Sequence, residues 1–231
     1  MTQHIPVITI DGPSGAGKGT ISQMLAKRLG WHLLDSGALY RVLASEALRQ
    51  QVPLQDARAL AKLAHNVDIR FMSKDAREPV RVYLNHADMT DEVRAEAMGE
   101  VASKISAFPE VRKALLDLQH NFRQMPGLVA DGRDMGTVVF VDAAVKVYLT
   151  ANPETRVKRR RTQLLAQGID ARLVSLTDEL AARDARDSDR AISPMKPAED
   201  AITVDTTGLS IEAVFDRVWQ IVQHRVDHQG E

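Results

Sequence analysis

The sequence contains no cysteine, and none of its apolar runs approaches the roughly 20 residues that a membrane-spanning helix needs. Without thiols there can be no disulfide bond, no thiolate catalysis and no zinc site built on cysteine. The first residues, MTQHIPVITID, also lack the basic and apolar segments of a secretory signal. We therefore expect the 231 residues to form a cytoplasmic protein of one globular unit, with no membrane partner.

Aromatic residues and net charge are also scarce. Only 4% of the residues are aromatic, and the formal net charge is −1 at pH 7. A nucleic-acid-binding role is disfavoured, because it calls for a basic surface with interleaved aromatic side chains. The seven histidines have no metal-ligand spacing, so we expect no metal site among them. The arginines cluster locally, in TRVKRRR (155–161) and ARDARDSDR (182–190), which favours a small phosphorylated ligand.

The order of the apolar segments predicts an α/β protein with a parallel sheet. PVITID (6–11) is short, apolar and rich in β-branched residues, as is typical of a buried parallel strand. A helix is expected from Gly17 to Leu29, where apolar residues share one face, and Gly30 ends it. WHLLD (31–35) is the next strand, and Ser36 is a candidate cap for the helix after it. Later strands are predicted at 127–134, 145–151 and 201–207, and later helices at 152–168 (capped by Asn152, with Pro153 at its first position and Gly168 as its stop), 175–190 and from the cap Ser210 onward.

The middle of the chain follows a different pattern. Residues 67–72 and 79–85 alternate between apolar and polar side chains, which indicates antiparallel strands with one solvent-exposed face. Residues 91–106 have the composition of a helix. We interpret residues 65–106 as a small lobe inserted into the parallel sheet.

The segment IDGPSGAGKGT (10–20) contains four glycines and one lysine between a strand and a helix. Glycines let the backbone curl so that successive N–H groups point at an anion, and the helix N-terminus adds its dipole. Lys18 would then reach the β- and γ-phosphates of a nucleoside triphosphate. A plain glycine-rich turn is the simpler alternative, but the strand before the motif and the helix after it are the context that a phosphate loop requires. Most such loops carry Ser or Thr after the lysine to hold magnesium, whereas this chain has Gly19 and then Thr20.

Polar residues follow two of the predicted strands. Ligands of open α/β sheets bind beyond the carboxyl ends of the strands. A single crevice is therefore expected to hold the residues that follow these strand ends, namely Asp35, Ser36, Tyr40, Arg41, Asp131, Arg133 and Asp134. Arg41 and Arg133 could each form an ordinary surface salt bridge. Next to a phosphate loop, the two together favour a clamp for a second phosphate group.

The charged helix near the end of the chain has two interpretations. Arg183, Arg186 and Arg190 recur at i, i+3 and i+7, so they share a face, and Asp187 lies among them. The helix could be a solvated, salt-bridged one. We favour a lid that closes arginines over the phosphates during transfer. No general base is required, because the second pKa of a phosphomonoester is about 6 and its oxygen is already anionic near neutrality.

The chain closely resembles the bacterial cytidylate kinases over essentially its whole length. The resemblance rests on ITIDGPSGAGKGT, LLDSGALYR, FPEVR, ADGRDMGTVVF, RDARDSDRAISP and DTTGLSIEAV. It implies a P-loop three-layer α/β fold with a five-stranded parallel sheet. It also implies a core of residues 1–37, 107–155 and 192–231, a monophosphate-binding lobe at about 38–106, and a helical lid at about 156–191. The implied activity is transfer of the γ-phosphate of ATP, with Mg²⁺, to CMP or dCMP in pyrimidine nucleotide metabolism.

The resemblance also implies roles for individual residues. ATP would be held by the residues of the glycine-rich motif, Gly12, Pro13, Ser14, Gly15, Ala16, Gly17, Lys18, Gly19 and Thr20. The CMP phosphate would be surrounded by Ser36, Tyr40, Arg41 and Arg133. The cytosine base would be read by Ser103, Arg112, Asp134 and Arg190, with Arg183 and Asp187 on the ribose. Lys18, Arg133, Arg183 and Arg190 are the expected catalytic residues.

Several alternatives remain open from the sequence. The acceptor could be UMP or another monophosphate on the same scaffold, and a switch that binds ATP without an acceptor is a rival from another class. Family members are usually treated as monomers, and we expect a monomer here. Arg159 or Arg161 could face the site from the VKRRR run, and the sequence does not choose among Arg156, Arg159, Arg160 and Arg161 for the ATP side.

Overall fold

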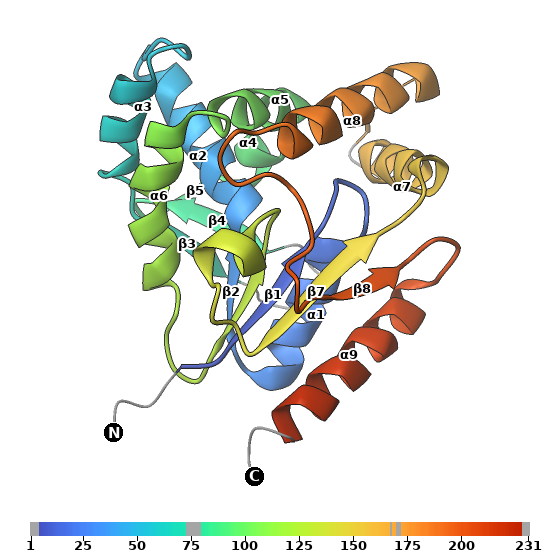
Figure 1. Cartoon of the computed structure of the whole chain (residues 1–231). Helices are drawn as coiled ribbons and strands as arrows, with labels where there is room; N and C mark the ends of the chain where they lie inside the picture. Colours follow the sequence, from blue (N-terminus) through green and yellow to red (C-terminus); the bar gives the residue numbers. More distant parts are fainter. Residues whose placement is uncertain (1–4, 73–79, 167, 170–171, 228–231) are drawn as a thin grey trace.

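The structure, a computed structural model, describes residues 5–72, 80–166, 168–169 and 172–227. At its centre is a sheet of five parallel strands in the order β2-β6-β1-β7-β8 (Figure 1). These strands are β1 (Val7–Asp11), β2 (His32–Asp35), β6 (Leu128–Asp131), β7 (Val145–Thr150) and β8 (Ile202–Asp205). The predicted parallel sheet is thus confirmed, with β1 in its middle.

Helices cover both faces of this sheet, which explains why its strands are nearly continuous apolar runs. Helices α1 (Lys18–Leu29) and α9 (Ile211–Asp227) pack on one face, where Ile8 and Ile10 of β1 meet Leu25 and Val218. Helix α2 (Ser36–Arg49) covers the other face. The carboxyl ends of β1, β2 and β6 therefore open toward one edge, where the loops of the site begin.

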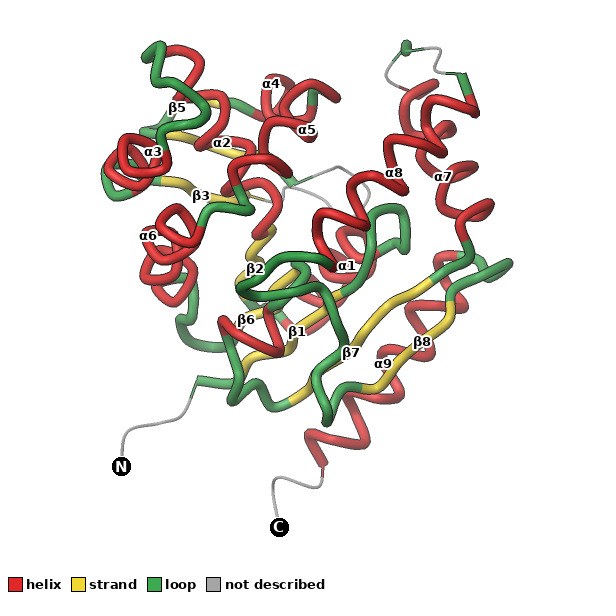
Figure 2. Tube along the Cα trace, turned by 45° about the horizontal axis from the view of Figure 1, so that its top comes forward, coloured by secondary structure: helices red, strands yellow, loops and turns green. Residues whose placement is uncertain are grey.

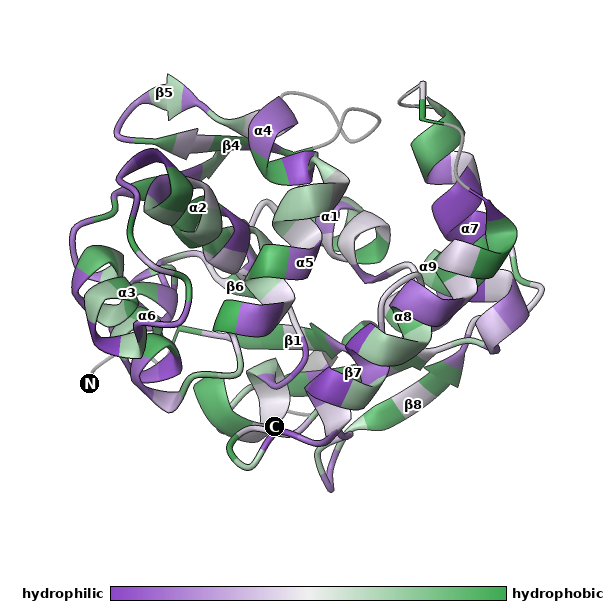
Figure 3. Ribbon diagram, turned by 90° about the horizontal axis from the view of Figure 1, so that it is seen from above, coloured by the Kyte–Doolittle hydropathy of each residue, from purple (hydrophilic) through white to green (hydrophobic). Residues whose placement is uncertain are grey.

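A second group of elements lies beside the sheet on the α2 side (Figures 1 and 3). It contains an antiparallel sheet in the order β3-β4-β5, as the alternating pattern predicted. The strands of this sheet are β3 (Ile69–Met72), β4 (Arg81–Leu84) and β5 (Ala87–Asp88). The group also contains the helices α3 (Ala57–Ala64), α4 (Thr90–Arg94), α5 (Glu96–Ile105) and α6 (Pro109–Asn121). The apolar faces of α2, α3, α5 and α6 share one core around Leu43, Leu60, Ile105 and Leu115.

Helices α7 (Pro153–Ala166) and α8 (Leu173–Ser188) form a third group, which packs around Val157, Leu164, Leu176 and Leu180. Figure 2 shows this pair on the far side of α1 from α3 and α6, with α8 the nearer of the two to α5. The hydropathy colouring of Figure 3 marks long hydrophilic stretches on both helices. Four apolar side chains therefore hold together a pair whose remaining faces are mostly polar.

Several local expectations hold. Gly30 ends α1 with φ +67°, the N–H of Thr155 donates to Asn152 Oδ1 over 2.8 Å at the start of α7, and Ser210 caps α9. Others are corrected. The cap of α2 is Asp35, whose Oδ1 accepts from the Ala38 N–H over 2.9 Å, because Ser36 already belongs to the helix.

The helix expected at 91–106 is in fact two helices. Ala95 separates α4 from α5 with an extended backbone, φ −54° and ψ 140°. Helix α8 begins at Leu173 instead of residue 175, and the strand expected at 79–85 begins with a residue outside the described ranges. Four elements were not predicted from the sequence, namely α3, α6, β5 and the π-helical turn η1 (Met135–Val139).

Among the described residues, no helix has both the length and the apolar character needed to cross a membrane.

Candidate active site

The glycine-rich loop joins the end of β1 to the start of α1. Gly12 has φ +141°, and a Cβ at this position would lie 2.0 Å from the Leu149 carbonyl oxygen on the neighbouring strand, so no larger residue fits. Gly17 caps α1 with φ +96°, a conformation that side chains rarely adopt. The loop therefore needs glycine at both ends so that its backbone N–H groups can point into the space in front of the N-terminus of α1.

Lys18 is the first residue of α1 and is buried, 7% exposed. Its ammonium donates to the Pro13 carbonyl oxygen within the loop over 3.0 Å. Burial lowers the pKa of Lys18 to about 7, and repulsion from Arg133 adds to this effect while Asp131 opposes it. A phosphate group beside Lys18 would reverse the shift, so the loop is electrostatically unsatisfied without an anion.

The structure explains why glycine stands at position 19, where other phosphate loops have Ser or Thr. A Cβ on Gly19 would come within 3.3 Å of Asp131 Oδ2, at the end of β6. Asp131 and Asp35 are register partners on neighbouring strands, and both line the same cavity. Burial raises the pKa of Asp131 to about 7, partly offset by Lys18. The carboxylate of Asp131 thus approaches the space in which other phosphate loops place a hydroxyl.

Asp11, the last residue of β1, holds the opposite side of the loop. Its two carboxylate oxygens accept the N–H groups of Met135 and Gly136, over 2.9 and 2.8 Å. Burial raises the pKa of Asp11 to about 6, although both of these hydrogen bonds lower it. The carboxylate ties the start of the phosphate loop to η1, which directly follows Arg133 and Asp134. This role of Asp11 was not predicted, because only the fold brings Asp11 to η1.

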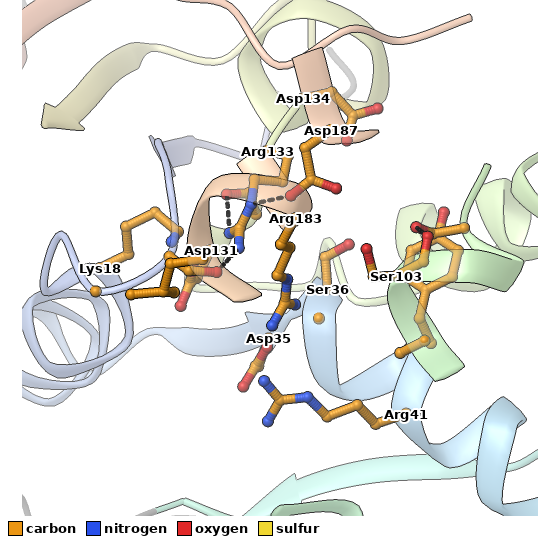
Figure 4. Close-up of a pocket in the computed structure, with 18 of the residues that line it drawn as sticks. Lys18, Asp35, Ser36, Arg41, Ser103, Asp131, Arg133, Asp134, Arg183 and Asp187 are labelled. Atoms are coloured by element: carbon orange, nitrogen blue, oxygen red, sulfur yellow. Dashed lines mark hydrogen bonds and ion pairs between the residues drawn. The ribbon is translucent and has the colours of Figure 1, made fainter. Parts of the chain in front are cut away.

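One cavity of about 270 Å³ lies between the loop, α2, α5 and α8. Figure 4 shows side chains from these separate elements converging on it. It is lined by all ten residues that were predicted to bind the acceptor, Ser36, Tyr40, Arg41, Ser103, Arg112, Arg133, Asp134, Arg183, Asp187 and Arg190. Of the predicted loop residues, Ser14, Gly15 and Lys18 line it, whereas Gly12, Pro13, Ala16, Gly17, Gly19 and the exposed Thr20 lie outside its wall.

Arg133 connects the loop to α8. Its Nη2 donates to Ser14 Oγ over 2.7 Å, and its Nε donates to Asp187 Oδ2 over 2.9 Å. Arg190 forms an ion pair with the other oxygen of Asp187. Burial opposes ionisation of Asp187, yet Arg133 and Arg190 hold its pKa below the usual range. Asp187 therefore keeps two arginines in place at the cavity wall.

Arg112 and Asp134 form a second, buried ion pair, with exposed side-chain fractions of 9% and 4%. Arg112 also donates from Nη1 to the Ser106 carbonyl oxygen over 3.2 Å, and its guanidinium carbon lies 5.8 Å from the centre of the Tyr40 ring. The Tyr40 hydroxyl is buried, and it has no hydrogen-bond partner among the described residues. This end of the cavity offers one carboxylate, one guanidinium and one free hydroxyl to a ligand.

Arg41 and Arg183 each have a buried hydrogen-bond donor, the Nε atom, without a partner among the described residues. Burial, followed by repulsion from Arg133 and Arg41, lowers the pKa of Arg183 to about 9. In the view of Figure 4, Arg183 lies between Lys18 and Arg41. Asp131 and Asp35 lie among these cations in Figure 4, but the cationic side chains that line the cavity outnumber its carboxylates by seven to five, which indicates a site for a polyanion.

The other lining residues act through fewer contacts. Ser36 Oγ donates to Gln119 Oε1 over 2.9 Å, and Ser103 Oγ accepts from Arg186 Nε over 3.1 Å. Gln119 was not anticipated, because α6 was not assigned from the sequence. Within the described ranges, no group of three or more His, Asp or Glu side chains is placed to hold a metal ion.

The arginines of α7 can now be distinguished. Arg160 lines the cavity, and Arg161 is exposed. Arg156 pairs with Asp184, and Arg159 donates to Thr206 Oγ1 and to the Thr206 carbonyl oxygen, both over 2.8 Å. Arg160 is therefore the one of these four that lines the cavity, and Arg159 and Arg161 do not. Arg156 and Arg159 instead donate to carbonyl oxygens of the glycine-rich loop, Ser14 O over 3.3 Å and Gly15 O over 3.5 Å.

Comparisons of the sequence with a family model and with curated relatives agree on one family. The model of the family described as Cytidylate kinase matches residues 8–224. A cytidylate kinase of Aeromonas hydrophila is 56% identical over 215 residues, 93% of each chain. One of Pseudomonas paraeruginosa is 50% identical over 230 residues, covering 100% of this chain and 99% of the relative. An uncharacterized protein from Eubacterium ventriosum has a similar solved structure, with a TM-score of 0.50, 11% identity and coverage of 96% and 99%.

Proposed function

The chain belongs to the cytidylate kinase family and transfers a phosphoryl group from ATP to CMP or dCMP, and we propose that it does so in the cavity between the phosphate loop, α2, α5 and α8. One observation carries this assignment. Seven cationic side chains line a single cavity together with only five carboxylates, and the Arg112–Asp134 pair forms a separate part of its wall. The cations are Lys18, Arg41, Arg112, Arg133, Arg160, Arg183 and Arg190, and the carboxylates are Asp35, Asp131, Asp134, Glu179 and Asp187. The cavity is thus matched to two phosphorylated groups and one polar base.

On the ATP side, the residues of the motif from Gly12 to Thr20 hold the triphosphate. Backbone N–H groups and the N-terminus of α1 face the phosphates, and Lys18 exchanges its bond to Pro13 for one to a phosphate oxygen. Magnesium bound with ATP would neutralise charge on the phosphates. The residues present fit such an ion, because Asp131 and Asp35 are neighbouring carboxylates in the cavity and Mg²⁺ usually takes one or two carboxylates together with phosphates and waters.

On the acceptor side, Ser36, Tyr40, Arg41 and Arg133 surround the CMP phosphate. The unpartnered Arg41 Nε is a donor without an acceptor, and a phosphate would supply one. The Tyr40 hydroxyl is also unpartnered, and its charged neighbours Arg112 and Asp134 place it where the phosphate set borders the base. Arg183 approaches the same region and is a candidate to stabilise the group in transfer, since its burial against other cations favours an added anion.

The base and the ribose lie between α5, α6 and α8 in this proposal. Asp134 accepts from the exocyclic amine of cytosine, while Arg112, Arg190 and Ser103 donate to its ring acceptors. Uracil carries a carbonyl oxygen where cytosine carries that amine, so it would face the carboxylate unfavourably. Arg183 and Asp187 contact the ribose.

The chemistry needs no general base. The CMP phosphate loses its second proton with a pKa of about 6, so its oxygen is already anionic near neutrality. That oxygen forms the new bond to the γ-phosphorus, and the bond from the γ-phosphorus to the bridging oxygen breaks, leaving its electron pair on ADP. The residues of the chain align the two oxygens and neutralise charge. Lys18, Arg133, Arg183 and Arg190 are the proposed catalytic side chains.

The same proposal assigns the remaining parts of the molecule. Residues 1–37, 107–155 and 192–231 are the core, residues 38–106 form the monophosphate-binding lobe, and residues 156–191 form the lid. Packing of α7 and α8 around their own apolar cluster supports a lid that moves as one piece. We further propose that the protein works as a cytoplasmic monomer.

The test is an acceptor-specificity assay. Purified protein is supplied with ATP, magnesium and one of CMP, dCMP, UMP, AMP or dTMP at a time, and ADP formation is followed. CMP and dCMP are expected to give the highest kcat/KM. Faster turnover of UMP, AMP or dTMP would contradict the assignment. Calorimetric titration with CMP separates the kinase from a nucleotide-binding switch, which would have no CMP site.

A further inference from the structure

A contact between α8 and α5 has no role in the assignments above. Ser103 is buried in the last turns of α5 and lines the cavity. Arg186 of α8 does not line the cavity. Nonetheless, Arg186 Nε lies 3.1 Å from Ser103 Oγ. Helix α8 runs close to α5 (Figures 2 and 3), and this bond is one of the places where the two helices meet.

The chemistry of the two groups fixes the direction of this bond. A guanidinium can only donate hydrogen bonds, so Ser103 Oγ is the acceptor. One lone pair of the hydroxyl is therefore occupied, and its own hydrogen is left for another acceptor. Within the described part of the chain, Ser103 Oγ has no such acceptor. The cavity that Ser103 lines is the remaining place for one.

The neighbouring Ser106 shows the same arrangement in complete form. Its hydroxyl accepts from Arg190 Nη2 over 2.8 Å and donates its own hydrogen to the Ser103 carbonyl oxygen over 2.9 Å. Arg186 of α8 and Arg190, just after that helix, thus approach two serines near the end of α5, and each serine is left with one hydrogen to donate. At Ser106 the acceptor is the protein backbone, whereas at Ser103 the residues that the structure describes provide none.

We propose that Arg186 is a positioning residue that fixes Ser103 as a hydrogen-bond donor toward the pyrimidine ring and thereby makes base discrimination depend on the contact between α8 and α5. The inference rests on the proposed role of Ser103 at the base. A hydroxyl held as a donor suits the N3 atom of cytosine, which is an acceptor, and opposes the N3–H of uracil, which is a donor. Without Arg186 the hydroxyl is free to rotate, and it can then accept from uracil as well as donate to cytosine.

The decisive variant is Arg186→Met, which keeps the length of the side chain and removes the donor. We expect kcat/KM for CMP to fall, kcat/KM for UMP to stay level or rise, and the CMP:UMP ratio to fall about 10-fold, the effect of one lost base contact. Arg186→Lys restores a donor and is expected to recover much of the ratio. Arg172→Met, which removes an exposed arginine from the other end of α8, is the matched control and should leave the ratio unchanged.

Ser103→Ala separates this inference from the proposed function. If Ser103→Ala lowers the ratio and Arg186→Met adds nothing further in that background, the two residues act together as proposed. If Ser103→Ala lowers the ratio but Arg186→Met reduces CMP and UMP turnover equally, Arg186 only helps to seat the lid and the inference is wrong. If Ser103→Ala leaves the ratio unchanged, Ser103 does not read the base, and its proposed role fails together with the inference.

Discussion

The phosphate loop and the arginine–aspartate cluster of Arg133, Arg183, Asp187 and Arg190 face one cavity but are built in opposite ways. The loop is one continuous segment whose glycines present backbone N–H groups, and its shape depends on positions such as Gly12 that allow no side chain. The cluster comes from two distant segments, and ion pairs with Asp187 hold Arg133 and Arg190 in the cavity wall. In the proposed function the loop binds the same triphosphate in every reaction, whereas the assembled wall contacts the acceptor, which differs between reactions.

This difference predicts where mutations act. Changes in the loop should remove phosphoryl transfer from every acceptor alike, because every reaction uses the same triphosphate. Changes at the base-reading part of the assembled wall, such as Asp134, should alter the ranking of acceptors more than the overall rate. The two regions meet at Arg133, which binds both Ser14 and Asp187, so its replacement would not separate them.

The largest effect is expected from Lys18→Ala. The variant loses the only charged side chain of the loop, and kcat should fall by at least about 10²-fold for CMP and UMP alike. The fold should remain intact, because Lys18 makes one hydrogen bond, to Pro13, and burial of its charge is already unfavourable. Steady-state kinetics with both acceptors, together with circular dichroism, would check this. Lys27→Ala, in the last turn of the same helix, is the control. Unchanged kinetics in Lys18→Ala would contradict the role of the loop.

A smaller and more selective effect is expected from Asp134→Ala. The ratio of kcat/KM for CMP over UMP should fall about 10- to 100-fold, since the carboxylate that accepts from the cytosine amine is lost. Arg112 would be left buried without its partner, which costs about 3–5 kcal/mol in the free energy of unfolding. Asp134→Asn keeps the shape and separates the two effects. An unaltered ratio in both variants would remove Asp134 from base recognition.

The same contrast explains what could be predicted from the sequence. The apolar runs of the strands, the glycine-rich loop and the caps at Gly30, Asn152 and Ser210 depend on residues close together in the sequence, and all of them were predicted. The break at Ala95 was missed, because the residues on either side of it are good helix formers and the break lies in the path between two packed helices.

The site was predicted unevenly for the same reason. The motifs supplied the candidate residues, and the structure brings all ten acceptor-side candidates to one cavity. Supporting residues carry no motif of their own. Gln119 becomes visible only because α6 brings it to Ser36, and Asp11 only because β1 ends beside η1. Contacts between distant segments leave no spacing in the sequence to detect.

The smallest expected effect is the uptake of a proton by Lys18 when ATP binds. Burial and Arg133 lower the pKa of Lys18 to about 7, so at pH 8 most molecules of the free protein carry a neutral lysine. A bound triphosphate favours the ammonium and raises this pKa. Binding of ATP at pH 8 should therefore take up close to one proton. Asp131, with a pKa raised to about 7 mainly by burial, is mostly ionised at this pH, and the negative ligand would shift it in the same direction.

Calorimetry of ATP binding at pH 8 in two buffers of different ionisation enthalpy measures this proton directly. Magnesium is left out, because a cation beside Asp131 would lower the pKa of that carboxyl and release a proton. Lys18→Arg keeps the charge but does not titrate, so its proton uptake should fall to the share that Asp131 contributes. Equal heats in the two buffers for the unmodified protein would mean that Lys18 is already charged before ATP arrives. In that case burial would not control the charge of Lys18. The loop and the assembled wall would then both carry permanent charges, and this difference between the two regions would be lost.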